Sequence, residues 1–214
     1  MINQKKLVDF LKNQNPNVKF LDKLKIVYRP YICPFNELLN DIPKNKSVFD
    51  IGCGSGQFAL LIAEYCSPVK IKGIEISDEL VKNANSLLKP YSTNIEISFE
   101  KFSGDDIPKN ISDYEIVTMI DVGHHVPKKL QVDFFKQLYQ KMKPGSTLIY
   151  KDINADSPLV YANKFHDLLL ASEIGNEMSL KTTLNLFTTI GFEIIKKSSK
   201  RMFWYPHFTI ITKK

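Results

Sequence analysis

Three closely spaced glycines form the most distinctive pattern in this sequence. Gly52, Gly54 and Gly56 lie within VFDIGCGSGQFAL (48–60), between two apolar runs, and Asp50 precedes the first of them by two residues. Glycine has no β-carbon, so a loop of this composition can turn sharply and bring its backbone against a ligand. The charge of Asp50 indicates which kind of ligand the loop binds.

Two ligands fit the glycines, and Asp50 favours one of them. Gly54, Gly56 and Ala59 match the G-x-G-x-x-A pattern of dinucleotide-binding loops. A carboxylate beside a pyrophosphate is repulsive, whereas the ammonium and sulfonium groups of S-adenosylmethionine attract it. Glu75 follows Gly56 by 19 residues and can accept hydrogen bonds from both hydroxyls of a ribose. Glu75 therefore indicates an adenosine-like ligand without choosing between the two.

A second acidic loop, FSGDDIP (102–108), follows an expected strand. A carboxylate here can accept a hydrogen bond from the exocyclic amine of adenine. Asp105 is the first candidate and Asp106 the second. We also expect Ile76, which follows Glu75, to contact the cofactor.

Methyl transfer from a sulfonium requires alignment of donor and acceptor, and an oxygen acceptor benefits from a base. Two histidines, His124 and His125, lie in DVGHHVP (121–127), after an expected strand. Histidine is the side chain best suited to accept a proton near neutral pH. Either one is a candidate base or substrate-orienting group, and packing of the loop is the competing interpretation. Asp152, at the end of the next strand, is an alternative base or orienting acid.

Four further residues are candidates for the substrate side of the site. Tyr28, Arg29 and Tyr31 lie in YRPYICPF (28–35), and His166 lies on an expected helix nearer the C-terminus. The first three could close over the substrate or over the cofactor carboxylate. Local packing is the alternative for all three.

The elements that must position these residues alternate between strand and helix, which predicts parallel pairing with right-handed crossovers. Two consecutive strands, GFEIIKKSS and FWYPHFTIITKK, then predict an antiparallel pair at the sheet edge. The predicted fold is α/β: a doubly wound, mostly parallel seven-stranded sheet with an antiparallel C-terminal edge hairpin and an N-terminal helical cap. Strands are expected at 47–51, 69–76, 94–102, 114–122 and 146–153, and helices at 57–66, 77–91, 129–142, 158–175 and 179–190.

The 214 residues suit a single domain. We expect residues 1–45 to form a cap, residues 46–153 the cofactor-binding core, and residues 154–214 the substrate-side helices and the terminal strand pair. Ligands of such a sheet bind beyond the carboxyl ends of its strands.

The bulk composition limits the classes of partner. The net charge is +6, but only Arg29 and Arg201 are arginines, and arginine is the preferred partner of phosphates and base edges. We therefore expect no nucleic-acid partner. Cys33, Cys53 and Cys66 form no C-x-x-C pair, so we expect reduced thiols and no metal site. We also expect no export signal, no membrane span and a cytoplasmic location. Oligomeric state is not readable from the sequence.

The motifs together resemble those of class I S-adenosylmethionine-dependent methyltransferases, over residues 47–153. The segments that carry the resemblance are VFDIGCGSGQFAL, GIEIS, FSGDDIP, IDVGHHVP and MKPGSTLIYKDI. The resemblance implies that Asp50 and the glycines face the methionine part of the cofactor, Glu75 the ribose and Asp105 the adenine, with Asp121 near the sulfonium. The segment YRPYICPF is similar to the cap of some small bacterial members.

Four functions follow from these observations. The first is S-adenosylmethionine-dependent methyl transfer to a small or amphipathic organic acceptor, with an oxygen nucleophile. The second is methylation of RNA or protein, supported only by the lysines of the chain. The third is a dinucleotide-dependent oxidoreductase, and the fourth is a non-catalytic cofactor-binding protein. The segment IDVGHH, at the end of the fourth expected strand, lacks the Asp/Asn-Pro-Pro motif with which resembling enzymes hold a planar amine. Its absence favours the first of these functions.

Overall fold

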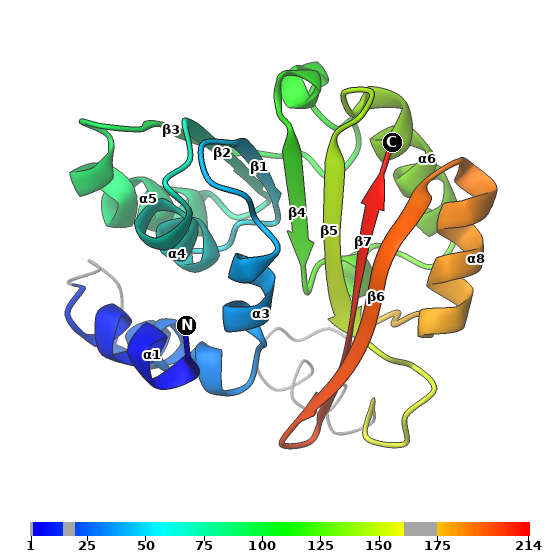
Figure 1. The fold of residues 1–214 in the computed structure, drawn as a ribbon, viewed down its shortest axis with the longest axis horizontal. Helices are drawn as coiled ribbons and strands as arrows, with labels where there is room; N and C mark the ends of the chain where they lie inside the picture. The colour runs from blue at the N-terminus through cyan, green and yellow to red at the C-terminus, as the bar shows by residue number, and fades with distance from the viewer. Residues whose placement is uncertain (1, 15–19, 161–174) are drawn as a thin grey trace. The chain divides into compact units, whose positions relative to one another are not determined.

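A computed structural model describes residues 2–14, 20–160 and 175–214 of the chain (Figure 1). The chain divides into two compact units. Unit 1 consists of Met1–Asp106 and Asp113–Val117, and unit 2 of Ile107–Ser112 and Thr118–Lys214. The strands belong to a seven-stranded sheet with the order β3-β2-β1-β4-β5-β7-β6, which confirms the predicted fold class.

The elements lie close to their predicted positions. The strands are β1 (Ser47–Ile51), β2 (Lys70–Glu75), β3 (Glu96–Lys101), β4 (Ile116–Ile120), β5 (Thr147–Ile153), β6 (Glu193–Met202) and β7 (Tyr205–Lys213). The α-helices are α1 (Gln4–Lys12), α2 (Phe20–Tyr28), α3 (Phe35–Asn40), α4 (Gln57–Cys66), α5 (Asp78–Leu88), α6 (Gln131–Lys141) and α8 (Leu180–Ile190). Short 3-10 turns are η1 (Arg29–Tyr31), η2 (Lys89–Tyr91), η3 (Lys109–Asp113) and η4 (Gly123–His125).

Unit 1 is built on the parallel strands β1, β2 and β3. Every residue of β1 is buried, as expected for a parallel strand covered on both faces. Helices α4 and α5 pack beside these strands (Figure 1). The hydroxyl of Ser77 caps α5 by accepting from the main-chain N–H of Leu80 at 3.4 Å. This arrangement places the loop between β1 and α4 at the carboxyl end of β1.

The N-terminal helices of unit 1 pack against α4. Helix α1 buries Leu7, Val8 and Leu11 on one face. The ring of Phe35, at the start of α3, stacks on Phe58 of α4 with centroids 5.0 Å apart. Residues 2–14 and 20–45 are thus largely helical, as predicted, and their action as a cap stays a prediction.

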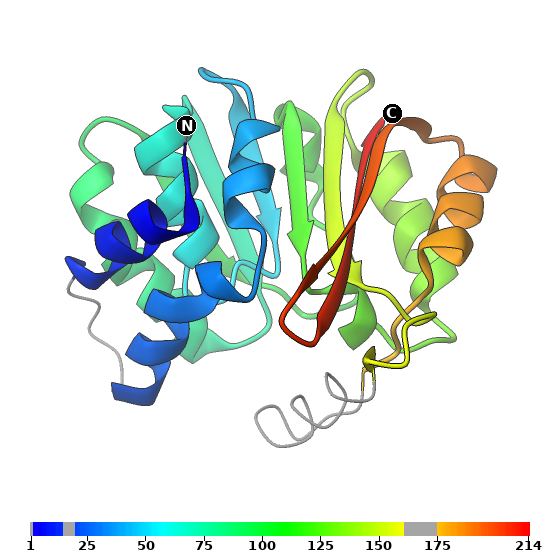
Figure 2. The same ribbon diagram turned by 60° about the horizontal axis from the view of Figure 1, so that its bottom comes forward.

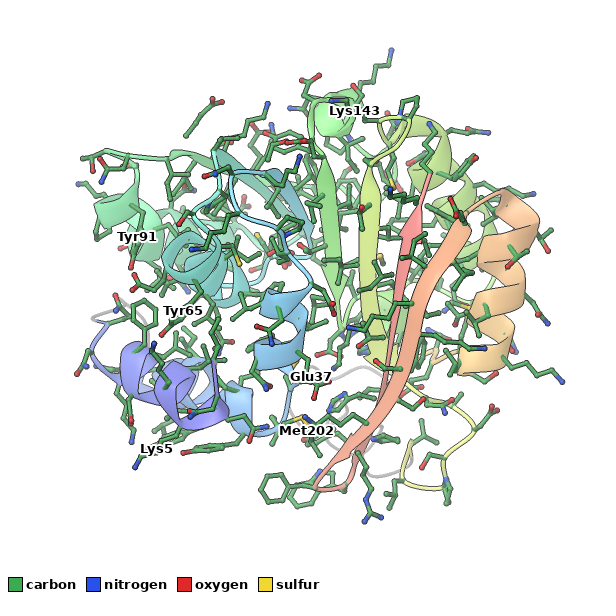
Figure 3. The ribbon with its side chains drawn as sticks, viewed as in Figure 1. Lys5, Glu37, Tyr65, Tyr91, Lys143 and Met202 are labelled. Atoms are coloured by element: carbon green, nitrogen blue, oxygen red, sulfur yellow. The ribbon has the colours of Figure 1, made fainter. Side chains whose placement is uncertain are left out.

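Unit 2 contains the antiparallel strands β5, β7 and β6, with β7 in the middle. Strand β7 is buried along nearly its whole length, whereas β6 at the edge is largely exposed. An aromatic cluster forms the core: the ring of Phe135 lies 5.5 Å from that of Tyr150 and 5.0 Å from that of Phe187. Met202 marks the end of β6, where the chain turns back into β7 (Figure 3).

The predicted helix at 158–175 falls almost entirely outside the described residues. In the described ranges, none of the helices has the length and apolar character that crossing a bilayer would require.

Candidate cofactor and catalytic site

The glycine loop folds tightly over the end of β2. The main-chain N–H groups of Gly52 and Cys53 both donate to the carbonyl oxygen of Ile74, at 2.8 and 3.1 Å. Gly52, Gly54 and Gly56 have φ values of +69°, +54° and +78°. These values lie in the left-handed region, which side chains with a β-carbon disfavour. The sequence of three glycines is therefore required by the backbone itself.

Gly54 and Gly56 serve different purposes. A β-carbon added at Gly56 would lie 2.9 Å from the β-carbon of Ala84 and 2.9 Å from a methyl group of Leu88, so this glycine permits α4 to pack on α5. A β-carbon added at Gly54 would meet no atom within 4 Å. The space over Gly54 is open, as a loop that contacts a ligand requires.

We expect the two alanine variants to fail in different ways. Gly56→Ala forces α4 and α5 apart and should destabilise the fold by roughly 1–3 kcal/mol. Gly54→Ala should cost only about 1 kcal/mol of backbone strain, yet it places a methyl group in the ligand's space. Thermal unfolding measured with and without S-adenosylhomocysteine separates the two effects. Equal stability losses in the two variants would contradict this division of roles.

Glu75 is held over the glycine loop. One carboxylate oxygen accepts from the main-chain N–H of Gly54 at 3.0 Å, and the other accepts from that of Ser77 at 3.1 Å. The side chain of Glu75 is half-buried. These two bonds fix the carboxylate at the edge of the glycine loop, and its contact with a ribose stays a prediction.

Asp50 lies inside unit 1, with only 3% of its surface exposed. Burial, and then the negative charges of Asp50 and Glu75, raise the pKa of the Cys53 thiol far above its usual range. Both carboxylates therefore lie close to Cys53 in the loop. Carboxylates beside the loop favour a cationic ligand over a pyrophosphate.

The other predicted contacts of unit 1 are less constrained. Asp105 and Asp106 are exposed, and the main-chain N–H of Asp105 donates to the hydroxyl of Ser103 at 3.4 Å. Ile76 is 62% exposed. Their roles toward adenine stay predictions.

The aromatic segment near the N-terminus forms a small cluster. Tyr28 and Tyr31 are exposed and stack on each other, with ring centroids 6.4 Å apart. The guanidinium of Arg29 lies over the ring of Phe35 at 5.7 Å. Contact of these residues with a substrate stays a prediction. His166 lies outside the described residues.

Unit 2 brings the two histidines and Asp152 together. The Nδ1 atom of His124 lies 2.5 Å from one carboxylate oxygen of Asp152, and the main-chain N–H of His124 donates to the other at 3.0 Å. The hydroxyl of Tyr150 also donates to Asp152, at 2.8 Å. The ring of His125 lies 4.2 Å from that of His124, centroid to centroid. His124 is buried and His125 is exposed.

The surroundings of Asp152 keep it ionised. Burial raises its pKa, but the charge and hydrogen bond of His124, together with the hydrogen bond of Tyr150, outweigh burial and lower the pKa. Burial and the Asp152 charge raise the pKa of Tyr150, so Tyr150 stays a hydrogen-bond donor. Asp152 is thus a buried anion that orients its neighbours.

Asp121 forms an ion pair with Lys151. Its carboxylate contacts the ammonium of Lys151, which is completely buried, and its main-chain N–H donates to the carbonyl oxygen of Lys151 at 2.9 Å. The φ of Asp121 is +57°, an unusual value for a residue other than glycine. The sequence predicted Asp121 but missed Lys151 and Tyr150. Alternation along β5 puts Tyr150 and Asp152 on one face and Lys151 on the other, which is a signal that could have found them.

The chain at 175–177 holds the histidine loop from the other side. The main-chain N–H of Asn176 donates to the carbonyl oxygen of His124 at 2.7 Å. The side-chain amide of Gln131, on α6, donates to the carbonyl oxygen of Asn176 at 2.7 Å. His124 is therefore fixed through both its side chain and its main chain.

A doubly wound sheet with a glycine loop and an acid at the end of each of its first two strands defines a Rossmann-like protein that binds an adenosine-containing cofactor. Residues 25–197 match the model of the family described as "Methyltransferase domain". The chain belongs to this family, the class I S-adenosylmethionine-dependent methyltransferases, and its cofactor is S-adenosylmethionine.

Curated relatives are similar over part of their length. The chain is 32% identical to 2-methyl-6-phytyl-1,4-hydroquinone methyltransferase of Synechocystis sp. over 119 residues, which is 54% of the chain and 35% of that protein. It is 28% identical to sterol 24-C-methyltransferase of Neurospora crassa over 164 residues, 72% of the chain and 41% of that protein. The chain therefore spans between a third and a half of the length of these two relatives.

A solved structure supports the fold. Magnesium protoporphyrin IX methyltransferase from Synechocystis, solved with bound S-adenosylhomocysteine, superposes with a TM-score of 0.69 at 15% identity. The match covers 98% of the chain and 94% of that protein. At this identity the similarity concerns the fold alone.

Proposed function

We propose that this protein transfers a methyl group from S-adenosylmethionine to an oxygen atom of a small, amphipathic organic acceptor. The observation that carries the proposal is the histidine pair after β4, of which His124 is held by the buried carboxylate of Asp152. One relative, a sterol 24-C-methyltransferase, is named for methylation of a carbon atom. Membership of the family therefore leaves the identity of the acceptor atom open. The choice of oxygen rests on the histidines.

The glycine loop fits the cofactor. The open space over Gly54, the carboxylate of Glu75 at the loop edge and the buried Asp50 supply a site for backbone contact, ribose hydroxyls and a cationic amino acid. When bound, S-adenosylmethionine supplies an electrophilic methyl group on a positively charged sulfur. We assign Asp50 to the ammonium group and Glu75 to the ribose.

The histidine pair supplies the acid–base chemistry. We assign His125 as the base, because its side chain is exposed, whereas the imidazole of His124 is already held by the carboxylate of Asp152. The imidazole of His125 takes the proton from the acceptor hydroxyl as the new carbon–oxygen bond forms. The carbon–sulfur bond breaks at the same time, and its electron pair stays on sulfur. Asp152, as a buried anion with several donors, positions His124, against which His125 packs.

Two relatives support the acceptor class. One is named for a phytyl hydroquinone and the other for a sterol, and both of these compounds combine a hydroxyl group with a large apolar part. A phenol or hydroquinone with an apolar tail is therefore the first acceptor to test.

A ligand comparison tests the cofactor, and a methyl assay tests the reaction. At 100 times its Kd, a ligand stabilises a protein by about 2.7 kcal/mol, so S-adenosylhomocysteine should raise the thermal midpoint and NAD should not. Transfer of labelled methyl from S-adenosylmethionine to a prenylated hydroquinone then reports activity. Stabilisation by NAD alone would overturn the cofactor assignment. Methylation of the same acceptor only at carbon would overturn the assignment of oxygen.

A further inference from the structure

The turn between β6 and β7 exposes two large aromatic side chains. Phe203 is 66% exposed and Trp204 is 50% exposed. They are the two residues of the turn, because Met202 pairs with Tyr205 across the hairpin. Their rings lie 6.1 Å apart, centroid to centroid. Adjacent exposed aromatic side chains of this size at a projecting turn indicate a binding surface.

The backbone conformation of this turn disfavours a bulky side chain at Phe203. Phe203 has a φ of +53°, in the left-handed region. In two-residue hairpin turns this position strongly favours glycine, asparagine or aspartate, and a bulky side chain there is an outlier. The turn geometry therefore does not explain the phenylalanine. Strain of this kind points to a function of the side chain itself.

Positive charge accompanies the aromatic side chains. The segment KKSSKRMFW (196–204) contains Lys196, Lys197, Lys200 and Arg201 and no acidic residue. Lys196, Lys197 and Arg201 are exposed, and Lys200 is half-exposed. Exposed aromatic residues beside lysine and arginine match an interface with anionic lipid headgroups and the acyl chains below them.

The turn lies at the same end of the strands as Asp152. Ile153, the last residue of β5, pairs with His207, three residues after Trp204. The next residue, Asn154, donates its main-chain N–H to the carbonyl oxygen of Pro206 at 2.7 Å. Figures 1 and 2 show the turn beyond the end at which β5 finishes. A surface that binds the turn would therefore face the edge of unit 2 that carries the histidine pair.

We propose that Phe203 and Trp204 insert into an anionic phospholipid surface, with the basic residues of β6 contacting the headgroups. The reason for docking rests on the proposed function: an amphipathic acceptor dissolved in the bilayer would then lie at the substrate edge of unit 2. Single-stranded RNA, which also binds aromatic and basic residues, is less favoured because it requires a groove that follows its backbone. A projecting two-residue turn suits insertion into lipid.

Trp204 is itself the reporter, since it is the single tryptophan of the chain. The full chain is mixed with vesicles of phosphatidylglycerol and phosphatidylcholine, or of phosphatidylcholine alone, without methyl donor or acceptor. We expect a blue shift of the tryptophan emission and co-sedimentation with the anionic vesicles, both reduced by high salt. Phe203→Gly should keep or raise the thermal midpoint and weaken vesicle binding about tenfold. Lys200→Gln with Arg201→Gln should weaken binding to anionic vesicles.

Matched variants elsewhere in unit 2 separate a specific effect from a general one. Val132→Ser removes an exposed apolar side chain of α6, and Lys143→Gln with Lys181→Gln removes two charges. These variants should bind vesicles as the wild type does. The proposal is overturned if anionic vesicles do not bind, if Phe203→Gly binds them unchanged, or if an RNA homopolymer shifts the emission while vesicles do not. Because no cofactor is present, a failed cofactor assignment would leave this result unaffected.

Discussion

Asp50→Asn is expected to bind S-adenosylmethionine about a hundredfold or more weakly than the wild type does. Asp50 is buried beside the glycine loop, where its charge is little screened by solvent. Removing one partner of a buried, charge-assisted contact costs about 2–5 kcal/mol, and each 1.4 kcal/mol is about tenfold in affinity. Asparagine keeps the shape of the side chain, so the loss should fall on binding more than on folding. Calorimetric titration with S-adenosylhomocysteine measures the effect.

A charge-matched variant controls for the change in net charge. Asp78 belongs to the same unit and pairs with Lys101 at 2.6 Å, with both side chains exposed. Asp78→Asn should leave the affinity almost unchanged, because exposed ion pairs contribute little. If Asp50→Asn kept its affinity, or bound NAD more tightly than S-adenosylhomocysteine, the electrostatic assignment of the loop would be wrong.

Strong local patterns predicted most of the fold. Strand β1 and helix α4 begin and end where the sequence placed them, at 47–51 and 57–66, because turn-forming residues flank both apolar runs. Strand β2 is shorter than the predicted 69–76. Val69 and Ile76 extend the apolar pattern, but both are exposed and lie outside the strand. The apolar character of a residue at a strand end does not indicate whether the residue is buried.

The site was predictable where one local motif supplies it. The glycines and Glu75 were named from such a motif, and the hydrogen bond from Gly54 to Glu75 joins them in the structure. Their contact with the cofactor stays a prediction. The bonds of Asp152 to His124 and of Lys151 to Asp121 each join residues about 30 positions apart. The partners of such bonds depend on how β5 lies beside the loop after β4, which composition and spacing do not specify.

The lysine beside Asp121 changes what that acid can do. The resemblance placed Asp121 near the sulfonium as a negative group, but its carboxylate contacts the buried ammonium of Lys151. The pair carries little net charge, so it attracts a cation less than an isolated carboxylate would. Asp121 also has a left-handed backbone conformation, and its ion pair with Lys151 helps to stabilise that conformation.

His125→Asn is expected to lower kcat by about 10²–10⁴-fold while leaving the affinity for S-adenosylhomocysteine unchanged, because it removes the group assigned to take the acceptor proton. His125 is exposed, so the variant should fold normally. Steady-state rates with the prenylated hydroquinone as acceptor provide the measurement.

His124→Asn should behave differently, because His124 positions its neighbour and is itself buried. Loss of its bond to Asp152 leaves a buried carboxylate without its main partner, which costs about 1–3 kcal/mol or more of stability. We therefore expect a lower thermal midpoint together with a smaller loss of kcat than in His125→Asn. If instead His124→Asn lowers kcat more than His125→Asn does, the base is His124, and the exposed ring of His125 only packs against it. If neither variant changes kcat, proton removal is not catalysed by this pair, and the argument for an oxygen acceptor fails with it.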